Sequence, residues 1–296
     1  MNTKRGLNNI LYGILSQVIT MGISIIVPRL VLINLGSETN GLLHSISTVF
    51  TYLSLLEAGV GKATNQALYK PLASDDKNEI NRIMAATNKF YRRTGYIYAA
   101  AVLVFAAVYC LFVKTSLPAT LVFSVIVLSG ASSVLSYFVQ GKYRVLMGAE
   151  GKGYILTNIS TAATILTSVC KILLLVWGFG VVPIQGMYLF FSFLQMLLVV
   201  RYIRRDYRWL DLKVEPDYDA ISQRNYVLLH QITGMIFDNT DILLLTVMAD
   251  LKVVSVYSMY TTFYTIIKSI LNIISYSYSY ALGQIFHADK EKFKRL

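Results

Sequence analysis

Long apolar stretches alternate with short polar segments along most of the chain. Eight of these stretches are long enough to cross a bilayer, because a membrane-spanning helix needs about 20 mostly apolar residues. They cover residues 9–27, 41–60, 94–113, 119–140, 154–177, 181–200, 225–247 and 254–280. The pattern predicts an all-α polytopic membrane protein with little chain left for a soluble domain.

Two longer polar segments, residues 62–93 and 201–224, interrupt this pattern. The second separates six predicted spans from two. We therefore expect residues 1–200 to form a first six-helix membrane lobe, residues 201–224 a cytoplasmic linker, and residues 225–296 the first two helices of a second lobe. The linker begins with a basic run and continues with an acidic one, which favours an exposed hinge.

Residues 80–91, within the first polar segment, have an amphipathic pattern. Such a helix suits the anionic surface of the inner leaflet, and it suits a solvated loop helix equally well. The sequence leaves both interpretations open.

The seventh predicted span carries a polar stripe. His230, Gly234, Asp238 and Asp241 follow one another at steps of four, four and three residues, which places them on one face of a helix. A carboxylate near the middle of a membrane costs about 2.5 to 3.5 kcal/mol, so such residues usually face a cavity and serve an ion or proton pathway. The stripe favours a transporter, and a structural ion pair with an internal lysine is the alternative.

Other predicted spans carry similar stripes. The eighth has Tyr257, Tyr264, Lys268 and Asn272 on one face, and the fifth has a threonine stripe that ends at Lys171. Faces of this kind suit a shared aqueous cavity better than lipid. Snorkelling to an interface is the alternative for the two lysines. For a stripe in the fourth span, Ser129, Ser133, Ser136 and Gln140, helix packing is the favoured interpretation. For Glu57, the favoured interpretation is an ion pair with an adjacent basic residue.

Composition and charge agree with a membrane protein. Hydrophobic residues make up 55% of the chain and charged residues 15%, and the mean hydropathy is +0.54. With both termini in the cytoplasm, the predicted inner segments hold 22 of the 27 Lys and Arg residues, as the positive-inside rule requires. The net charge of +11 therefore needs no nucleic-acid partner, because the basic residues are dispersed over every inner segment.

Several chemistries are disfavoured by the sequence. Cys110 and Cys170 both fall within predicted spans, where a structural disulfide is not expected, and two cysteines give no metal-site spacing. The one DxD sequence, Asp217-Tyr218-Asp219, lies in the short segment 201–224 and not in a large loop, and no phosphate-binding glycine loop is present. We therefore expect no catalytic residues and no metal, and an enzyme of glycan assembly is disfavoured.

Two segments carry a family resemblance. The first runs from Asn40-Gly41-Leu42-Leu43 through Leu55-Leu56-Glu57-Ala58-Gly59-Val60-Gly61-Lys62-Ala63. The second is Asn239-Thr240-Asp241-Ile242-Leu243-Leu244-Leu245, followed by Val256-Tyr257-Ser258-Met259-Tyr260. With these segments the whole chain resembles the polysaccharide flippases of the MOP superfamily, which include Wzx-type lipid-linked oligosaccharide flippases and are related to MATE exporters.

The resemblance implies a fold and an activity. It implies two helical bundles that form a V around a central cavity and work by alternating access. The substrate would be an oligosaccharide linked to undecaprenyl pyrophosphate, moved from the inner to the outer face of a bacterial cytoplasmic membrane for capsule, O-antigen or exopolysaccharide synthesis. Members usually have more than eight spans, so we expect the second lobe to be incomplete and the chain to be a fragment or a truncated gene product.

Transport of such a substrate needs cations for the phosphates and hydroxyls or rings for the sugars. Membrane lipids and other membrane proteins of glycan assembly are the further partners expected, with H⁺ or Na⁺ as the coupling ion and no other cofactor. A MATE-like exporter of organic cations is the alternative, disfavoured by the internal lysines. The expected substrate-binding residues are Lys171, Lys268, Arg29, Lys62, Tyr257, Tyr260, Tyr264 and Asn272, and the expected ion-coupling residues are Asp238, Asp241 and His230.

Overall fold

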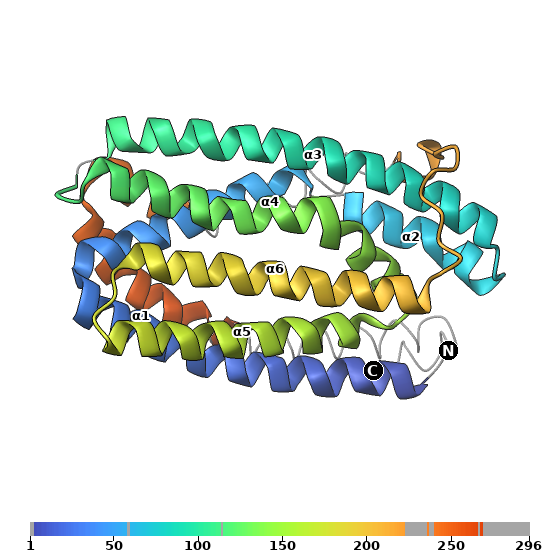
Figure 1. Cartoon of the computed structure of the whole chain (residues 1–296), viewed down its shortest axis with the longest axis horizontal. Coiled ribbons are helices and arrows are strands. Elements are labelled where there is room, and N and C mark those ends of the chain that lie inside the picture. The colour runs from blue at the N-terminus through green and yellow to red at the C-terminus, as the bar shows by residue number, and fades with distance from the viewer. Residues whose placement is uncertain are drawn as a thin grey trace, which may run out of the picture.

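The computed structural model describes residues 3–57, 60–113, 115–222, 236, 240–265 and 267–268. Within these ranges the chain forms helices and their connections, and no strand is found. Five helices are long and apolar enough to cross a membrane. They are α1 (Thr3–Leu53), α3 (Lys77–Phe112), α4 (Ala119–Ala149), α5 (Gly153–Val176) and α6 (Val181–Asp206). The prediction of an all-α polytopic membrane protein is confirmed (Figure 1).

Helix α1 consists of two helices joined at Gly36. The backbone there has φ 84° and ψ 168°, a conformation that is open to glycine and costly for other residues. Figure 1 shows the chain reversing direction at this point, so that residues 37–53 run back along the bundle. The predicted spans at 9–27 and 41–60 therefore lie on either side of Gly36, although the second helix ends at Leu53 and a 3₁₀ turn, Ser54–Leu56, follows it.

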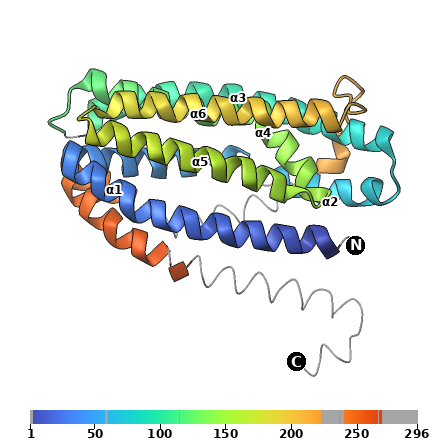
Figure 2. The same cartoon turned by 60° about the horizontal axis from the view of Figure 1, so that its bottom comes forward.

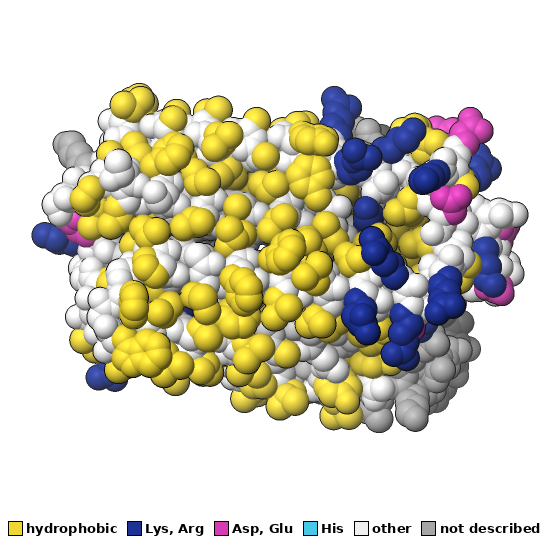
Figure 3. All heavy atoms as spheres, in the orientation of Figure 1, with side chains coloured by type: hydrophobic (Ala, Val, Ile, Leu, Met, Phe, Trp, Pro, Cys, Tyr) yellow, Lys and Arg dark blue, Asp and Glu magenta, His cyan; other side chains and the backbone are white. Residues whose placement is uncertain are grey.

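The basic side chains gather at one end of the bundle, beside a broad apolar belt (Figure 3). We call this the basic end. Here α2 (Val60–Ala73) and the first half of α3 form a helical hairpin. Asp76 caps α3 by accepting a hydrogen bond of 3.0 Å from the backbone N–H of Glu79. Helix α3 thus begins well before the predicted span at residue 94, because an apolar window finds only the part of a helix that lipid surrounds.

The amphipathic segment 80–91 is covered by the protein itself. Ile80, Ile83 and Met84 are at most 1% exposed and pack in one core with Leu68 of α2. Neither interpretation drawn from the sequence is therefore correct, since the apolar face meets neither lipid nor solvent. The partners that bury it come from distant parts of the chain, which helical periodicity does not reveal.

The linker is docked on this hairpin and is not an exposed hinge. Its first residues, Arg201–Asp206, are helical and belong to α6. Beyond them, Asn81 of α3 donates a hydrogen bond of 3.4 Å to the Trp209 carbonyl and accepts one of 3.1 Å from the backbone N–H of Asp211. Ile221 is fully buried against α2 and α3.

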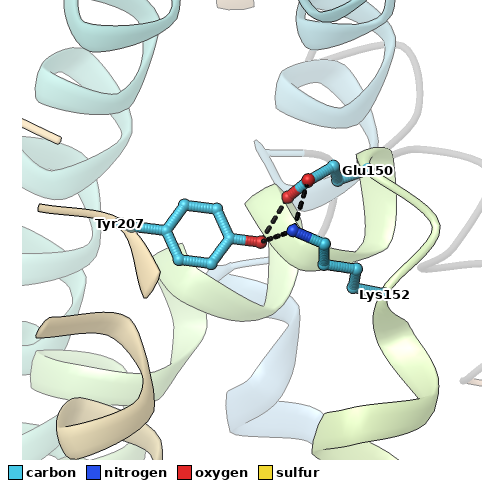
Figure 4. Close-up of polar contacts among 3 residues, drawn as sticks. All are labelled: Glu150, Lys152 and Tyr207. Atoms are coloured by element: carbon cyan, nitrogen blue, oxygen red, sulfur yellow. Dashed lines mark hydrogen bonds and ion pairs between the residues drawn. The ribbon is translucent and has the colours of Figure 1, made fainter. Parts of the chain in front are cut away.

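A cluster of three polar side chains fixes the start of the linker (Figure 4). The Tyr207 hydroxyl donates a hydrogen bond to the Glu150 carboxylate, and Lys152 forms an ion pair with the same carboxylate. The Lys152 Nζ atom also lies 5.0 Å from the centroid of the Tyr207 ring. Because Glu150 and Lys152 belong to the turn between α4 and α5, this cluster joins the linker to the core of the first lobe.

Residues 240–248 and 251–265 form a helical hairpin at the opposite end of the bundle (Figure 2). It packs against the second half of α1, where Asn40 donates a hydrogen bond of 2.8 Å to the Ser255 hydroxyl. Gly41 provides the closest approach, because a Cβ atom placed there would lie 1.9 Å from the Leu251 carbonyl oxygen. The described part of the predicted second lobe is therefore in direct contact with the first.

Candidate functional site

Connected polar cavities run through the first lobe. The cavity furthest from the basic end has a volume of about 520 Å³, and its walls come from α1, α4, α5 and α6. We call it the Lys171 cavity. Lys171 is half-buried, and its Nζ atom lies 5.2 Å from the centroid of the Tyr188 ring, a cation–π distance. The polar residues of its wall are Ser47, Thr51, Ser54, Ser129, Ser133, Lys171, Gln185 and Tyr188.

Two further cavities continue this one toward the basic end. The middle cavity, of about 220 Å³, shares Ser133 and Tyr188 with the Lys171 cavity. The cavity nearest the basic end, of about 400 Å³, shares Gln140, Arg144 and Gln195 with the middle one. Because neighbouring cavities share these lining residues, the three follow one another along the lobe, and together we call them the polar path.

The path follows α4 from Ser129 to Gly148, which is about 28 Å at a rise of 1.5 Å per residue. Because α4 begins at Ala119, the path extends from the interior of the lobe to the basic end and does not reach the opposite end of the helix. Helices α4 and α5 each pack against α6 and contact one another little, so the faces between them stay open.

The serine stripe of α4 lines the path. Ser129 and Ser133 face the Lys171 cavity, and Ser136 and Gln140 face the middle one. Helix packing, the interpretation favoured by the sequence, also applies to part of the stripe, because Gln140 accepts a hydrogen bond of 3.5 Å from Gln195 of α6. The stripe therefore both joins helices and lines the cavities.

A side pocket of about 150 Å³ opens from the same path. Glu57 and Arg144 both line it, beside the tyrosines Tyr91, Tyr98 and Tyr137. Arg144 is exposed to these cavities. The described side chains include no carboxylate within ion-pairing distance of Arg144, although Glu57 of the same pocket is near enough to interact with its charge. The sequence predicted that Glu57 pairs with an adjacent basic residue. Glu57 lines the pocket together with Arg144, which is distant in the sequence. The side chain of the neighbouring Lys62 lies outside the described residues, so the predicted pair stays a prediction.

Of the predicted substrate-binding residues, Lys171 lies in the polar path. Arg29 is exposed on the first half of α1 and lines none of these cavities. Tyr257 and Tyr260 line a separate groove of about 520 Å³ at the opposite end of the bundle. The backbone of Lys62 lies in α2, and Asn272 lies outside the described residues.

The remaining predicted residues that the structure describes line none of the cavities of the polar path. The Tyr257 hydroxyl donates a hydrogen bond of 2.6 Å to the Asp241 carboxylate. Lys268 has its Nζ atom 6.0 Å from the centroid of the Tyr264 ring. The predicted site is thus divided, with Lys171 in the first lobe and these two pairs on the helical hairpin of the second. His230 and Asp238 lie outside the described residues.

Several residues that line the polar path were not predicted from the sequence. Arg144 was assigned to a polar segment between spans, whereas it lies on α4, which continues to Ala149. The sixth span carries a stripe, Gln185, Tyr188, Ser192 and Gln195, at steps of three, four and three residues, and all four line the path. This stripe follows the same spacing as the others and was detectable in the sequence.

Comparison with known proteins points in one direction. A family model described as "Polysaccharide biosynthesis protein" matches residues 7–279, which is most of the chain. No curated protein and no solved structure matches the chain.

Proposed function

The chain belongs to the polysaccharide biosynthesis protein family, the family of Wzx-type polysaccharide flippases, and we propose that it moves a lipid-linked oligosaccharide from the inner to the outer face of a bacterial cytoplasmic membrane. Members of this family are transporters and not enzymes. The membership confirms the resemblance found in the sequence. The substrate, the direction of movement and any coupling to an ion are part of the proposal.

The polar path through the first lobe carries the proposal. A diphosphate and several sugars cannot enter hydrocarbon without losing their hydration, so their transfer needs a polar route about 30 Å long. The path supplies hydroxyl and amide groups along its length and a cation toward each end, Arg144 nearer the basic end and Lys171 further away. That combination suits an anionic sugar conjugate.

The two cations suit different tasks. The planar guanidinium of Arg144 can bind phosphate oxygens in a bidentate manner, and its place near the basic end suits first capture from the inner leaflet. The ammonium of Lys171 is a point charge deeper in the lobe, where it can receive the same phosphates later in the movement. Tyr188, which lines two of the three cavities, offers a ring for a sugar face.

Ion coupling is the least constrained part of the proposal. Asp241 is the predicted coupling residue that the structure describes, and the Tyr257 hydroxyl is its hydrogen-bond donor. A carboxylate in this place can bind H⁺ or Na⁺ in exchange for the substrate. The competing activity, export of organic cations, is disfavoured because Lys171 and Arg144 would repel a cationic cargo.

The proposal is tested by replacing Arg144 in cells that depend on this protein for surface polysaccharide. Loss of a bidentate phosphate contact costs about 1.5 to 3 kcal/mol, so Arg144→Ala should lower export by about tenfold or more while lipid-linked intermediates accumulate. Arg144→Lys should recover part of the export, since the charge remains and the fork is lost.

Arg208→Ala is the matched control, because Arg208 is an exposed arginine of the linker that lines none of the cavities. It should export at the wild-type level with the same amount of protein in the membrane. Normal export by Arg144→Ala at normal abundance would contradict the role of the polar path.

A further inference from the structure

The lipid-facing surface of the first lobe changes character sharply near the basic end. On α3, the exposed Arg92 lies one helical turn from the exposed Tyr96 and Ile97, on the side of the basic end. On α6, the exposed Leu197 and Leu198 are followed by the exposed Arg204. Figure 3 shows the same boundary, with Lys and Arg directly beyond the apolar belt. Such a boundary marks the level at which lipid headgroups lie.

Three cations from three helices gather at this boundary. The Nζ atom of Lys142, on α4, donates a hydrogen bond of 2.6 Å to the Asn88 side chain and lies 5.1 Å from the centroid of the Tyr143 ring. Arg92 of α3 lies within electrostatic reach of Lys142, and Arg204 of α6 lies within reach of Tyr143. We call Arg92, Lys142 and Arg204 the three-helix cluster.

The three-helix cluster lacks a counter-charge among the described side chains. The ion pairs found there join Lys152 to Glu150 and Arg205 to Asp206, so the nearby carboxylates are already paired. Lys142 is half-buried, and like charges held together in such a place repel one another. Binding of an anion would relieve this repulsion.

From this arrangement we infer that the three-helix cluster is a binding site for the headgroup of an anionic phospholipid of the inner leaflet. The headgroup phosphate would lie among Arg92, Lys142 and Arg204, and the acyl chains would lie along the exposed apolar surface of α3 and α6. Amide and aromatic groups that hold an ammonium in place, as Asn88 and Tyr143 do here, distinguish the cluster from a freely moving surface lysine.

This site is separate from the polar path. Lys142 and Arg144 are two residues apart on α4, which is about 200° around the helix, so their side chains leave from opposite faces. Lys142 points toward α3, whereas Arg144 lines the cavities on the other side. The inference therefore does not depend on the proposed function, and binding of a phospholipid can be measured without transport.

Native mass spectrometry of the purified full chain tests the inference by comparing phosphatidylglycerol with phosphatidylcholine. A cation near an anionic headgroup contributes about 1 kcal/mol, so Lys142→Gln should weaken phosphatidylglycerol binding about fivefold and the triple change at Arg92, Lys142 and Arg204 about a hundredfold. Binding of phosphatidylcholine should not change. Lys142→Arg should bind as the wild type does.

The matched control removes three charges elsewhere, with Lys70→Gln, Lys213→Gln and Lys252→Gln combined, all at exposed positions outside the cluster. This variant should keep the affinity of the wild type. Equal losses in both triple variants would overturn the inference, because net charge alone would then explain binding. Displacement of the lipid by millimolar inorganic phosphate would also overturn it, since the site would then recognise free phosphate and not a lipid.

Discussion

The ammonium of Lys171 is held by an aromatic ring and by no carboxylate among the described residues. Its Nζ atom lies 5.2 Å from the centroid of the Tyr188 ring, and both residues line the Lys171 cavity. A cation–π contact of this kind contributes about 0.5 to 2 kcal/mol and leaves the positive charge free to act on a passing anion. The pair therefore positions a charge without neutralising it.

Replacement of Lys171 tests this role. We expect Lys171→Gln to lower polysaccharide export by about tenfold, because the deeper part of the polar path would lose its positive charge. Tyr188→Phe keeps the ring and should export normally, whereas Tyr188→Leu should lower export by about threefold. Cell-surface polysaccharide and membrane abundance are the measurements, with Lys213→Gln, at an exposed position of the linker, as a lysine control outside the path. If Lys171→Gln exports normally, the ammonium has no part in transport.

Single residues were predictable where a stripe lay within one apolar span. Lys171 and the serines of α4 were found in this way, because helical spacing fixes which side chains share a face. Arg144 was missed because it lies beyond the apolar window, on a helix that continues past the lipid. The placement of Asp241 beside Tyr257, 16 residues away, depends on how two helices meet, which spacing within one helix does not determine.

Among the elements, the linker shows most clearly how a short segment is fixed by a few contacts. The Tyr207 hydroxyl donates to Glu150, and the Tyr207 ring lies under the Lys152 ammonium. A hydrogen bond to a charged group contributes about 1.5 to 3 kcal/mol. Because residues 207–222 lead from α6 toward the predicted second lobe, we expect this cluster to restrain how far that lobe can move relative to the first.

Loss of that hydrogen bond should release the linker. We expect Tyr207→Phe to raise the rate of tryptic cleavage at Arg208 and Lys213 by about tenfold, because local opening of the docked segment becomes less costly. Tyr218→Phe is the control, since Tyr218 is a half-exposed tyrosine of the same segment with no hydroxyl hydrogen bond among the described contacts. Equal cleavage rates in both variants and the wild type would show that the cluster does not hold the linker.

The spanning elements were largely predictable and their partners were not. Each of the first six apolar windows overlaps a spanning helix, although the window at 41–60 continues past the end of its helix at Leu53, since length and hydropathy largely decide which segments cross a bilayer. The docking of residues 207–222 depends on Asn81, a polar residue in an amphipathic helix, whose two linker contacts are 128 and 130 residues away. Hydropathy carries no information on such contacts.

At the scale of the whole molecule, the hairpin of residues 240–265 packs along the second half of α1, from Tyr52, whose hydroxyl lies 3.0 Å from that of Thr240, to the end opposite to the basic end. Two buried hydrogen bonds join the hairpin and α1, from Asn40 to Ser255 and from Thr246 to Ser45. Between these bonds, Gly41 lies directly against the backbone of Leu251. Under the proposed function, with the basic end in the cytoplasm, this contact would close the outer side of the molecule, and we expect release of a substrate to that side to require that the contact separates.

A single methyl group at Gly41 should therefore shift the molecule toward the outward-open arrangement. In Gly41→Ala the new Cβ would lie 1.9 Å from the Leu251 carbonyl oxygen, and overpacking of this kind costs about 1 to 3 kcal/mol. A cysteine introduced as Ser129→Cys, with Cys110 and Cys170 replaced by alanine, should react at least about fivefold faster with an impermeant maleimide added outside. Gly186→Ala, also within a helix but with open space around the new Cβ, should react as the parent does. Labelling by the maleimide requires no transport, so this result does not depend on whether the protein exports polysaccharide. If Gly41→Ala reacts at the same rate as the parent, the contact between Gly41 and Leu251 is not a barrier to opening.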